Sequence, residues 1–443
     1  MPIVACGELF SRDRNQQLEG PAILSSFLKL PQASSTFLNI LNRLKNTKRM
    51  DKIHPMKNPF TPGFGNSPPV LAGRDDILAE FADAIDNGPG ALGRATLYTG
   101  ARGTGKTVML NEVGDIAKGR GWMVIDETAT KGFITRLVTQ HLPALLIEHD
   151  PKGKKSNVTG VTGPFGIGGL SWDSTNSHVV AAGLRNQLEL LCALLANNGT
   201  GLLITLDEMH HRQADEMRDF FTALQHLIRE DREIAFAAAG LPSEVSDLLN
   251  DDVLTFLRRA DRYTLGAVAY GEVERTLRQT VESVGRTIGA EACALAAAAT
   301  GGYPFLIQLV GHHIWRQHPN EVDVTVADVE GGVPAALRRM GSLVHEPALR
   351  DLSHVDRTFL LAMANDDGPS RIADIAARLD VEVKYAGVYR QRLLDAQMIG
   401  SVGRGLVGFA VPYMRDYLRE HGAMEAHLQV SSHTTGPEEL PPG

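Results

Sequence analysis

The sequence is poor in the features that mark secreted, zinc-binding or membrane-spanning proteins. Of its 443 residues only three are cysteines, Cys6, Cys192 and Cys293, and they lie far apart without a CxxC pair. This usage fits a reducing compartment and argues against a disulfide framework or a cysteine zinc site. No apolar run reaches the ~18 residues of a transmembrane helix, and the first residues lack the long apolar stretch of a secretory signal. We expect a cytoplasmic protein without a membrane partner.

An excess of basic charge is also missing. The formal net charge is −8, so any contact with nucleic acid would depend on a local patch rather than on the whole chain. Hydrophobic residues make up 43% of the chain and charged residues 22%, as in an ordinary soluble protein with real cores. At ~100–200 residues per domain, the length predicts two or three domains.

Residues 1–60 differ from the rest, because they hold nine lysines and arginines against four acidic residues. A Pro/Gly loop at 58–69, NPFTPGFGNSPP, follows, and no helix could cross it. We expect residues 1–67 to be a largely disordered extension, with Met50 or Met56 as the native start. Finding Met1 by N-terminal sequencing of the natural protein would contradict that start.

From residue 68 onward, short apolar strands alternate with amphipathic helices. Strands are expected at 95–99, 122–126, 202–206 and 234–239. Such alternation predicts an α/β fold with a mostly parallel sheet covered by helices. A segment rich in Gly, Ser and Thr at 151–176 is interpreted as an insertion. After residue 270 the strands are expected to stop and a small helical bundle to follow.

The stretch GARGTGKT follows the first expected strand, precedes a helix and fits the pattern G-x-x-x-x-G-K-[ST]. Its glycines let the loop curl so that backbone N–H groups point at phosphate oxygens, and the next helix directs its positive end there. Lys106 would reach the β- and γ-phosphates, and Thr107 would offer its hydroxyl to Mg²⁺. The alternative, a plain Gly-rich turn, is disfavoured because the pattern is specific and its context is satisfied. The expected nucleotide-binding residues are Gly100, Ala101, Arg102, Gly103, Thr104, Gly105, Lys106 and Thr107.

An acidic pair, Asp207 and Glu208, follows the apolar strand LLITL. Ligands of parallel sheets lie beyond the carboxyl ends of the strands, so both carboxylates are expected beside the phosphate loop. Asp207 would hold the Mg²⁺ shell, and Glu208 would polarise the attacking water as general base. The weaker alternative is a solvated acidic pair at a strand end. A small-molecule kinase is disfavoured, because the Glu after the Asp suits water activation.

His210 and His211 follow this pair and invite a metal interpretation. The spacing is not HExxH, and adjacent side chains on a helix point ~100° apart. We therefore expect helix-face histidines near the nucleotide rather than metal ligands.

Together these motifs resemble those of the AAA+ ATPases, in particular the archaeal-ATPase and origin-recognition-like branch that borders the STAND signalling ATPases. The resemblance covers roughly residues 68–421. It implies a P-loop NTPase domain, a helical lid and a C-terminal winged helix, with ATP and Mg²⁺ as cofactors. PPVLAGRDD is similar to the family's opening motif, which implies that Gly73 and Arg74 lie beside the adenine. GGYPFLIQLVGHHIW resembles the lid motif, which implies that Pro304 lies near the base.

TFLRRADRYTLG resembles the segment that carries the family's arginine finger. The match implies Arg259, with Arg258 as the alternative, acting on a neighbour's γ-phosphate in a homo-oligomer. From the residues alone, Arg258, Arg259 and Arg262 fit surface charges equally well.

Two departures from the family predict slow hydrolysis, which suits a switch. The strand at 234–239 ends without a polar sensor residue, for which Ser243 is a weak substitute. The lid offers only Arg338 or Arg339 as a sensor arginine.

The pattern of residues 351–421 predicts three helices followed by a hairpin, which is the order of a winged helix. Ser353 is the expected N-cap of the first helix, with Asp356 three residues on, and Pro369 and Ser370 are expected to start the second. The third helix would enter the major groove of DNA. The residues expected to meet DNA are Lys384, Tyr385, Tyr389, Arg390, Arg392 and Arg404, the last at the hairpin tip.

The same segment holds nine basic and ten acidic residues, so docking to a protein competes with duplex DNA as its role. The first hypothesis is a DNA-associated ATPase that converts ATP to ADP and phosphate, because basic residues cluster on one helix and the hairpin. The second is a STAND-type nucleotide switch acting on a protein partner, and a weaker third is a structural P-loop relic. The predicted division is an extension (1–67), an ATPase domain (68–268), a lid (269–345), a winged helix (346–421) and a disordered tail (422–443).

Overall fold

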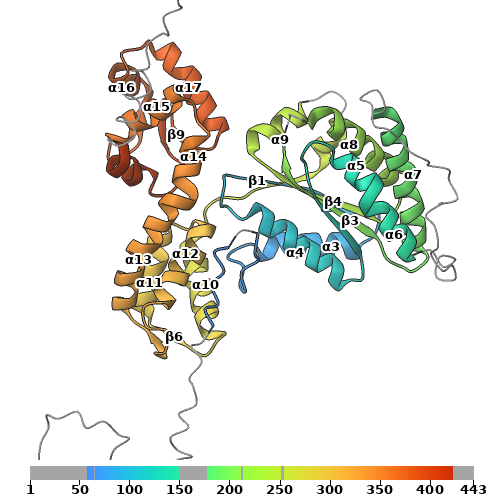
Figure 1. Ribbon diagram of the computed structural model, residues 1–443, viewed down its shortest axis with the longest axis horizontal. Helices are drawn as coiled ribbons and strands as arrows, with labels where there is room; N and C mark the ends of the chain where they lie inside the picture. The colour runs from blue at the N-terminus through green and yellow to red at the C-terminus, as the bar shows by residue number, and fades with distance from the viewer. Residues whose placement is uncertain (1–56, 64, 150–176, 211–212, 251–253, 423–443) are drawn as a thin grey trace, which may run out of the picture. The chain divides into compact units, whose positions relative to one another are not determined.

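The computed structural model describes residues 57–63, 65–149, 177–210, 213–250 and 254–422, all within the compact unit Lys57–Gly443 (Figure 1). The expectations for residues 1–56, for the insertion at 151–176, for His211 and for the tail after residue 422 lie outside these ranges. Among the described helices, none has the length and apolar character that a membrane span requires.

A five-stranded sheet in the order β2-β3-β4-β1-β5 forms the centre of the first part, and every neighbouring pair runs parallel. The predicted α/β fold with a parallel sheet is thereby confirmed. The interior strand β3 is buried from Leu202 to Leu206, because helices cover both faces of the sheet. The strands are β1 (Ala95–Thr99), β2 (Met123–Thr128), β3 (Leu202–Met209), β4 (Ile234–Gly240) and β5 (Asp261–Thr264).

Helices lie on both faces of this sheet (Figure 1). Helices α3 (Asp75–Asp86) and α4 (Lys106–Gly119) share a core with Tyr98 and Leu203, which face one side. Leu97 faces the opposite side, because successive side chains of a strand alternate. The elements that pack there are α5 (Phe133–Arg136), η3 (Leu137–His141), α6 (Leu142–His149), α7 (Ser177–Ala196), α8 (Ala214–Arg229), α9 (Pro242–Leu249) and η6 (Thr255–Arg259).

The part after residue 269 is mainly helical, as predicted. The expectation that strands stop there is wrong in one detail, because β6 (Thr287–Ile288) and β7 (Asp323–Val324) form a short parallel pair. Strands of two residues are too short to show a periodic pattern. The helices are α10 (Tyr270–Glu282), α11 (Ala290–Thr300), α12 (Pro304–Trp315), α13 (Val326–Met340), the π-helical turn η7 (Gly341–His345) and α14 (Glu346–Arg350).

Three helices and a small sheet form the C-terminal unit, residues 354–422. Ser353 accepts the N–H of Asp356 and so caps the first helix, as predicted. Ser370, expected at a helix start, lies instead in β8, where it pairs with Val407. The sheet order is β8-β10-β9. The elements are α15 (His354–Ala364), β8 (Ser370–Arg371), α16 (Ile372–Arg378), α17 (Val383–Asp395), β9 (Ile399–Gly403) and β10 (Leu406–Phe409).

Residues 57–63 and 65–71, here called the N-terminal strap, pack on α12. The Phe60 side chain is only 4% exposed, and Asn58 donates a hydrogen bond to the carbonyl of His312 (3.1 Å). The expected disordered extension up to residue 67 is therefore wrong for residues 57–63 and 65–67. A buried aromatic ring and polar contacts fix this stretch, although its Pro/Gly composition suggested a loop without partners.

Candidate functional site

The loop between β1 and α4 curls tightly around its glycines. Gly103 and Gly105 have φ angles of 76° and 90°, in the left-handed region that favours glycine. A Cβ atom at Gly103 would lie 2.5 Å from the hydroxyl oxygen of Tyr303, so this position has no room for a side chain. The curl leaves the backbone N–H groups that start α4 facing the cavity, as an anion site requires.

The Lys106 ammonium folds back on this loop. Its Nζ donates to the carbonyl oxygens of Gly100 and Ala101, both at 2.9 Å. Burial lowers the pKa of Lys106, and the nearby carboxylate of Asp207 opposes that shift. These two carbonyls keep the Lys106 ammonium beside the loop. A phosphate oxygen, as a charged and therefore stronger acceptor, would replace them.

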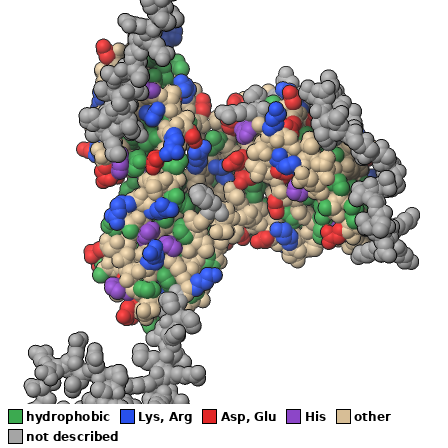
Figure 2. Space-filling model, in the orientation of Figure 1, with side chains coloured by type: hydrophobic (Ala, Val, Ile, Leu, Met, Phe, Trp, Pro, Cys, Tyr) green, Lys and Arg blue, Asp and Glu red, His purple; other side chains and the backbone are tan. Residues whose placement is uncertain are grey.

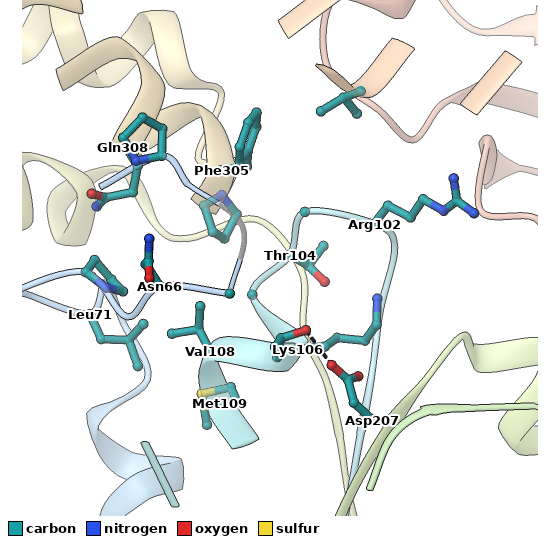
Figure 3. Close-up of a pocket in the computed structure, with 18 of the residues that line it drawn as sticks. Asn66, Leu71, Arg102, Thr104, Lys106, Val108, Met109, Asp207, Phe305 and Gln308 are labelled. Atoms are coloured by element: carbon teal, nitrogen blue, oxygen red, sulfur yellow. Dashed lines mark hydrogen bonds between the residues drawn. The ribbon is translucent and has the colours of Figure 1, made fainter. Parts of the chain in front are cut away.

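The first turn of α4 meets the end of β3 through one short hydrogen bond. Thr107 Oγ1 donates to Asp207 Oδ2 at 2.6 Å (Figure 3). A hydroxyl and a carboxylate side by side are oxygen ligands of the kind that Mg²⁺ takes together with substrate phosphates and water. No cluster of three or more His, Cys, Asp or Glu that could hold a metal occurs in the described part of the chain. The residues thus fit a cation that is shared with a phosphate ligand.

Glu208 follows in an unusual backbone conformation. Its φ of 56° lies in the left-handed region, which non-glycine residues seldom adopt and which clusters at functional sites. Its N–H donates to Asp207 Oδ1 (2.8 Å), and its side chain is exposed and lines the same cavity. The predicted meeting of both carboxylates with the phosphate loop is therefore present.

The cavity has a volume of about 730 Å³, within the usual range for small-molecule sites. The phosphate loop forms one end, with residues 102–107 along its wall. The strap, the start of α12, the η7–α14 junction and the ends of β3 and β4 are among the other walls. Among the residues in these walls are Asn66, Leu71, Pro304, Phe305, Ile307, Gln308, Leu343, Val344 and Pro347.

Arg74 and Gly73 stand where α3 begins. Arg74 lines the cavity and donates to the carbonyl of Gly266 (2.7 Å), and burial lowers the pKa of its guanidinium. Gly73 does not line the cavity; a Cβ there would lie 3.2 Å from the side chain of Val268. Of the pair, Arg74 is thus the one that reaches the ligand space.

The start of α12 contacts the phosphate loop directly. The Phe305 N–H donates to the carbonyl of Gly103 (3.2 Å), and the Tyr303 hydroxyl donates to the carbonyl of Arg102. Pro304, predicted to lie near a base, lines the cavity between them. Tyr303 belongs to the same lid motif as Pro304, whereas Phe305, the next residue, was not among the predicted site residues.

The residues predicted to serve as the arginine finger or as sensors lie away from the cavity. Arg259 is exposed at the end of η6 and makes no hydrogen bond or ion pair with any described residue, whereas Arg258 donates to the carbonyl of Leu249 (2.8 Å). Ser243 donates to the carbonyl of Asp395 (2.9 Å). None of these side chains lines the cavity, and neither do Arg338 and Arg339 of α13.

His210 lines the cavity, and its Nδ1 is buried without a hydrogen-bond partner in the described ranges. The prediction that His210 lies on the face of a helix is wrong, because this residue directly follows strand β3 and lies outside any helix.

The residues predicted to meet DNA divide into two groups. Lys384, Tyr385 and Arg404 are exposed, and Tyr389 and Arg390 are partly so. Arg392 is also exposed, and its guanidinium donates to the buried carboxylate of Asp356 (2.7 Å) and lies over the ring of Tyr389. Part of its charge is thus paired within the C-terminal unit.

Comparisons with known proteins agree with this geometry. Residues 70–236 match the family model of the AAA ATPase domain, and residues 342–418 match a domain of unknown function, DUF8462. No curated protein matches the chain. The chain therefore contains an AAA ATPase domain, which carries the phosphate loop and the acidic pair.

Two solved structures share the fold. The Walker-type ATPase of Pyrococcus abyssi has a TM-score of 0.55 at 16% identity, over 79% of this chain and 96% of its own. The Aeropyrum pernix ORC2 protein, in ADPNP–ADP complexes, has a TM-score of 0.56 at 13% identity, over 83% of this chain and 98% of its own. At these identities the likeness concerns the fold.

Replacing Lys106 by alanine should abolish nucleotide binding, because the phosphates lose their charged donor; we expect affinity to fall by roughly 100-fold or more. Calorimetric titration with ADP and ATP measures this. Lys118→Ala, on an exposed position of the same helix, is the matched control. Normal affinity of Lys106→Ala would contradict the assignment of the loop.

Proposed function

We propose that this protein binds ATP with Mg²⁺ at the phosphate loop and hydrolyses it to ADP and phosphate. The observation that carries the proposal is the hydrogen bond of 2.6 Å between Thr107 and Asp207, with Lys106 and Glu208 as their immediate neighbours. This group combines a cationic donor, a cation site and a carboxylate base at one edge of the sheet. The AAA ATPase domain at residues 70–236 supports the same activity.

Each side chain has a defined task in this proposal. Lys106 exchanges the carbonyls of Gly100 and Ala101 for phosphate oxygens. Thr107 and Asp207 hold the cation, which supplies positive charge to the phosphates when it is bound. Glu208 takes the proton of the water that attacks the γ-phosphate.

Turnover by a single chain should be slow. Ser243, Arg338 and Arg339 do not line the cavity, so none of these three candidates contributes a sensor to the γ-phosphate. Arg259 is exposed at the end of η6, and we infer that it completes the site of a neighbouring copy. This requires a homo-oligomer, with Arg259 contributing charge stabilisation in trans.

The proposed division is an ATPase domain (68–268), a lid (269–345) and a winged helix (346–421). Contacts between these parts connect the nucleotide site with the C-terminal unit. Leu343 and Val344 of η7 line the cavity. Arg102 of the phosphate loop forms an ion pair with Asp351 (2.9 Å), just before α15. A ligand that rearranges this loop therefore acts on the start of the C-terminal unit.

Duplex DNA is the target we propose for that unit. Its three helices and hairpin have the order of a winged helix, in which the third helix, α17, meets the major groove. Lys384 and Tyr385 on α17 and Arg404 at the hairpin tip are exposed, and they are the residues we assign to DNA phosphates.

A protein target is the second candidate, and a specific observation favours it. Val383 and Val388 of α17 and Val402 of β9 are 54–56% exposed, next to Tyr385 at 49%. Figure 2 shows acidic, basic and apolar side chains interspersed on the visible surface of this unit. The ion pair of Arg392 with Asp356 offsets part of the basic charge on this surface.

Glu208→Gln should retain nucleotide affinity and lose turnover, since an amide cannot accept the proton of the attacking water. A loss of roughly 100-fold or more is expected for a general base. Phosphate release, measured with and without duplex DNA, tests this against Glu230→Gln on the exposed surface. Unchanged turnover would remove Glu208 as the base, and turnover insensitive to DNA would favour the protein-directed switch.

Arg259→Ala should lower turnover only in the assembled state, because the finger serves a neighbouring site. Turnover measured across a dilution series, with the oligomer followed by light scattering, tests this. An equal loss in a demonstrated monomer would argue against action in trans.

Combined Lys384→Ala and Arg404→Ala should weaken binding to random duplex. Each lost phosphate contact should reduce the slope of log affinity against log salt by about one. Lys131→Ala, an exposed change in the ATPase domain, is the control. Failure of the wild-type protein to bind duplex in either nucleotide state would instead support the protein partner.

A further inference from the structure

The strap forms the end of the cavity farthest from the catalytic carboxylates. In Figure 3, Asn66 and Leu71 lie on the opposite side of the cavity from Asp207. A nucleotide whose phosphates occupy the loop at Lys106 extends its base toward this end.

The strap is held in position by contacts with two different helices. The Thr61 N–H donates to Gln308 Oε1 of α12 (3.1 Å), and the Phe60 ring covers Gly311 of the same helix, where a Cβ would lie 2.2 Å from the ring. Asn111 of α4 donates to the carbonyl of Gly65 (2.8 Å). The strap therefore joins α12 to the helix that begins at the phosphate loop.

The walls at this end suit a planar apolar ring that carries a few polar atoms. Leu71, Met109, Phe305 and Ile307 supply apolar surface. The carboxamide of Asn66 lines the same space and makes no hydrogen bond with any other described residue. It thus offers one donor and one acceptor to a ligand.

We propose that Asn66 determines the base specificity of the nucleotide site and selects adenine over guanine. An asparagine amide pairs with adenine through N6–H₂ and N7, one donor and one acceptor. Guanine presents two acceptors, O6 and N7, at that edge, so the Asn66 oxygen would face another acceptor. The inference rests on the proposed nucleotide site and adds to it the residue that recognises the base.

Titration of the full-length protein with ADP and with GDP tests the inference. The wild-type protein should prefer ADP, and Asn66→Ala should weaken ADP binding by roughly tenfold while GDP binding changes little, so the preference falls. Asn198→Ala, at an exposed turn, is the control and should leave the preference intact.

A second variant tests the position of the strap without replacing Asn66 itself. Gly311→Ala adds a methyl group that would clash with the Phe60 ring, and the clash should displace the strap. This variant should therefore lower the preference for ADP over GDP, as Asn66→Ala does. Thermal melting verifies that the variant is folded.

The outcomes separate this inference from the proposed function. An unchanged ADP preference in Asn66→Ala, or no preference in the wild-type protein, would overturn the role of Asn66 while the site defined by Lys106 stands. Failure of the wild-type protein to bind either nucleotide would overturn the site and the inference together.

Discussion

The hydrogen bond between Thr107 and Asp207 is the contact on which the site depends. Thr107 lies in the first turn of α4, the helix after β1, whereas Asp207 lies near the end of β3 a hundred residues later, and β4 lies between the two strands. Only parallel strands bring these carboxyl ends to the same edge of the sheet. Because Lys106 and Glu208 are the sequence neighbours of the two partners, the same contact brings the ammonium group and the proposed base to the same edge of the sheet.

Three segments from outside the sheet contact the phosphate loop or the helix that follows it. The Phe305 N–H bonds to Gly103, the strap reaches α4 through Asn111, and Arg102 pairs with Asp351. The last pair is more than 60% exposed on both sides, where an ion pair contributes only about 0.2–1 kcal/mol. A ligand that binds one state of the loop more tightly than the other shifts the equilibrium by that difference in binding free energy, and about 1 kcal/mol is enough to break such a pair.

The C-terminal unit uses part of its charge for its own stability. The Asp356 side chain is 4% exposed, and its Oδ2 accepts hydrogen bonds from Ser353 and Arg392, whereas its Oδ1 has no partner among the described residues. The Arg392 guanidinium thereby offsets part of the cost of burying this charge. The outer face of α17 then combines Lys384 and Tyr385 with exposed valines. This surface differs from that of a purely electrostatic DNA reader, whose affinity depends on phosphate contacts.

The sequence by itself determined the chemistry of the loop and the sheet. GARGTGKT between an apolar strand and a helix, and Asp207-Glu208 after LLITL, are local patterns whose geometry follows from the elements that carry them. Ser353 is a local cap of the same kind. Only the tertiary structure decided the roles of Asn66, Phe60 and Arg392. Phe60 meets Gly311, and Arg392 meets Asp356; such pairs are set by how the helices pack, because neither member carries a signal of its partner in its own neighbourhood.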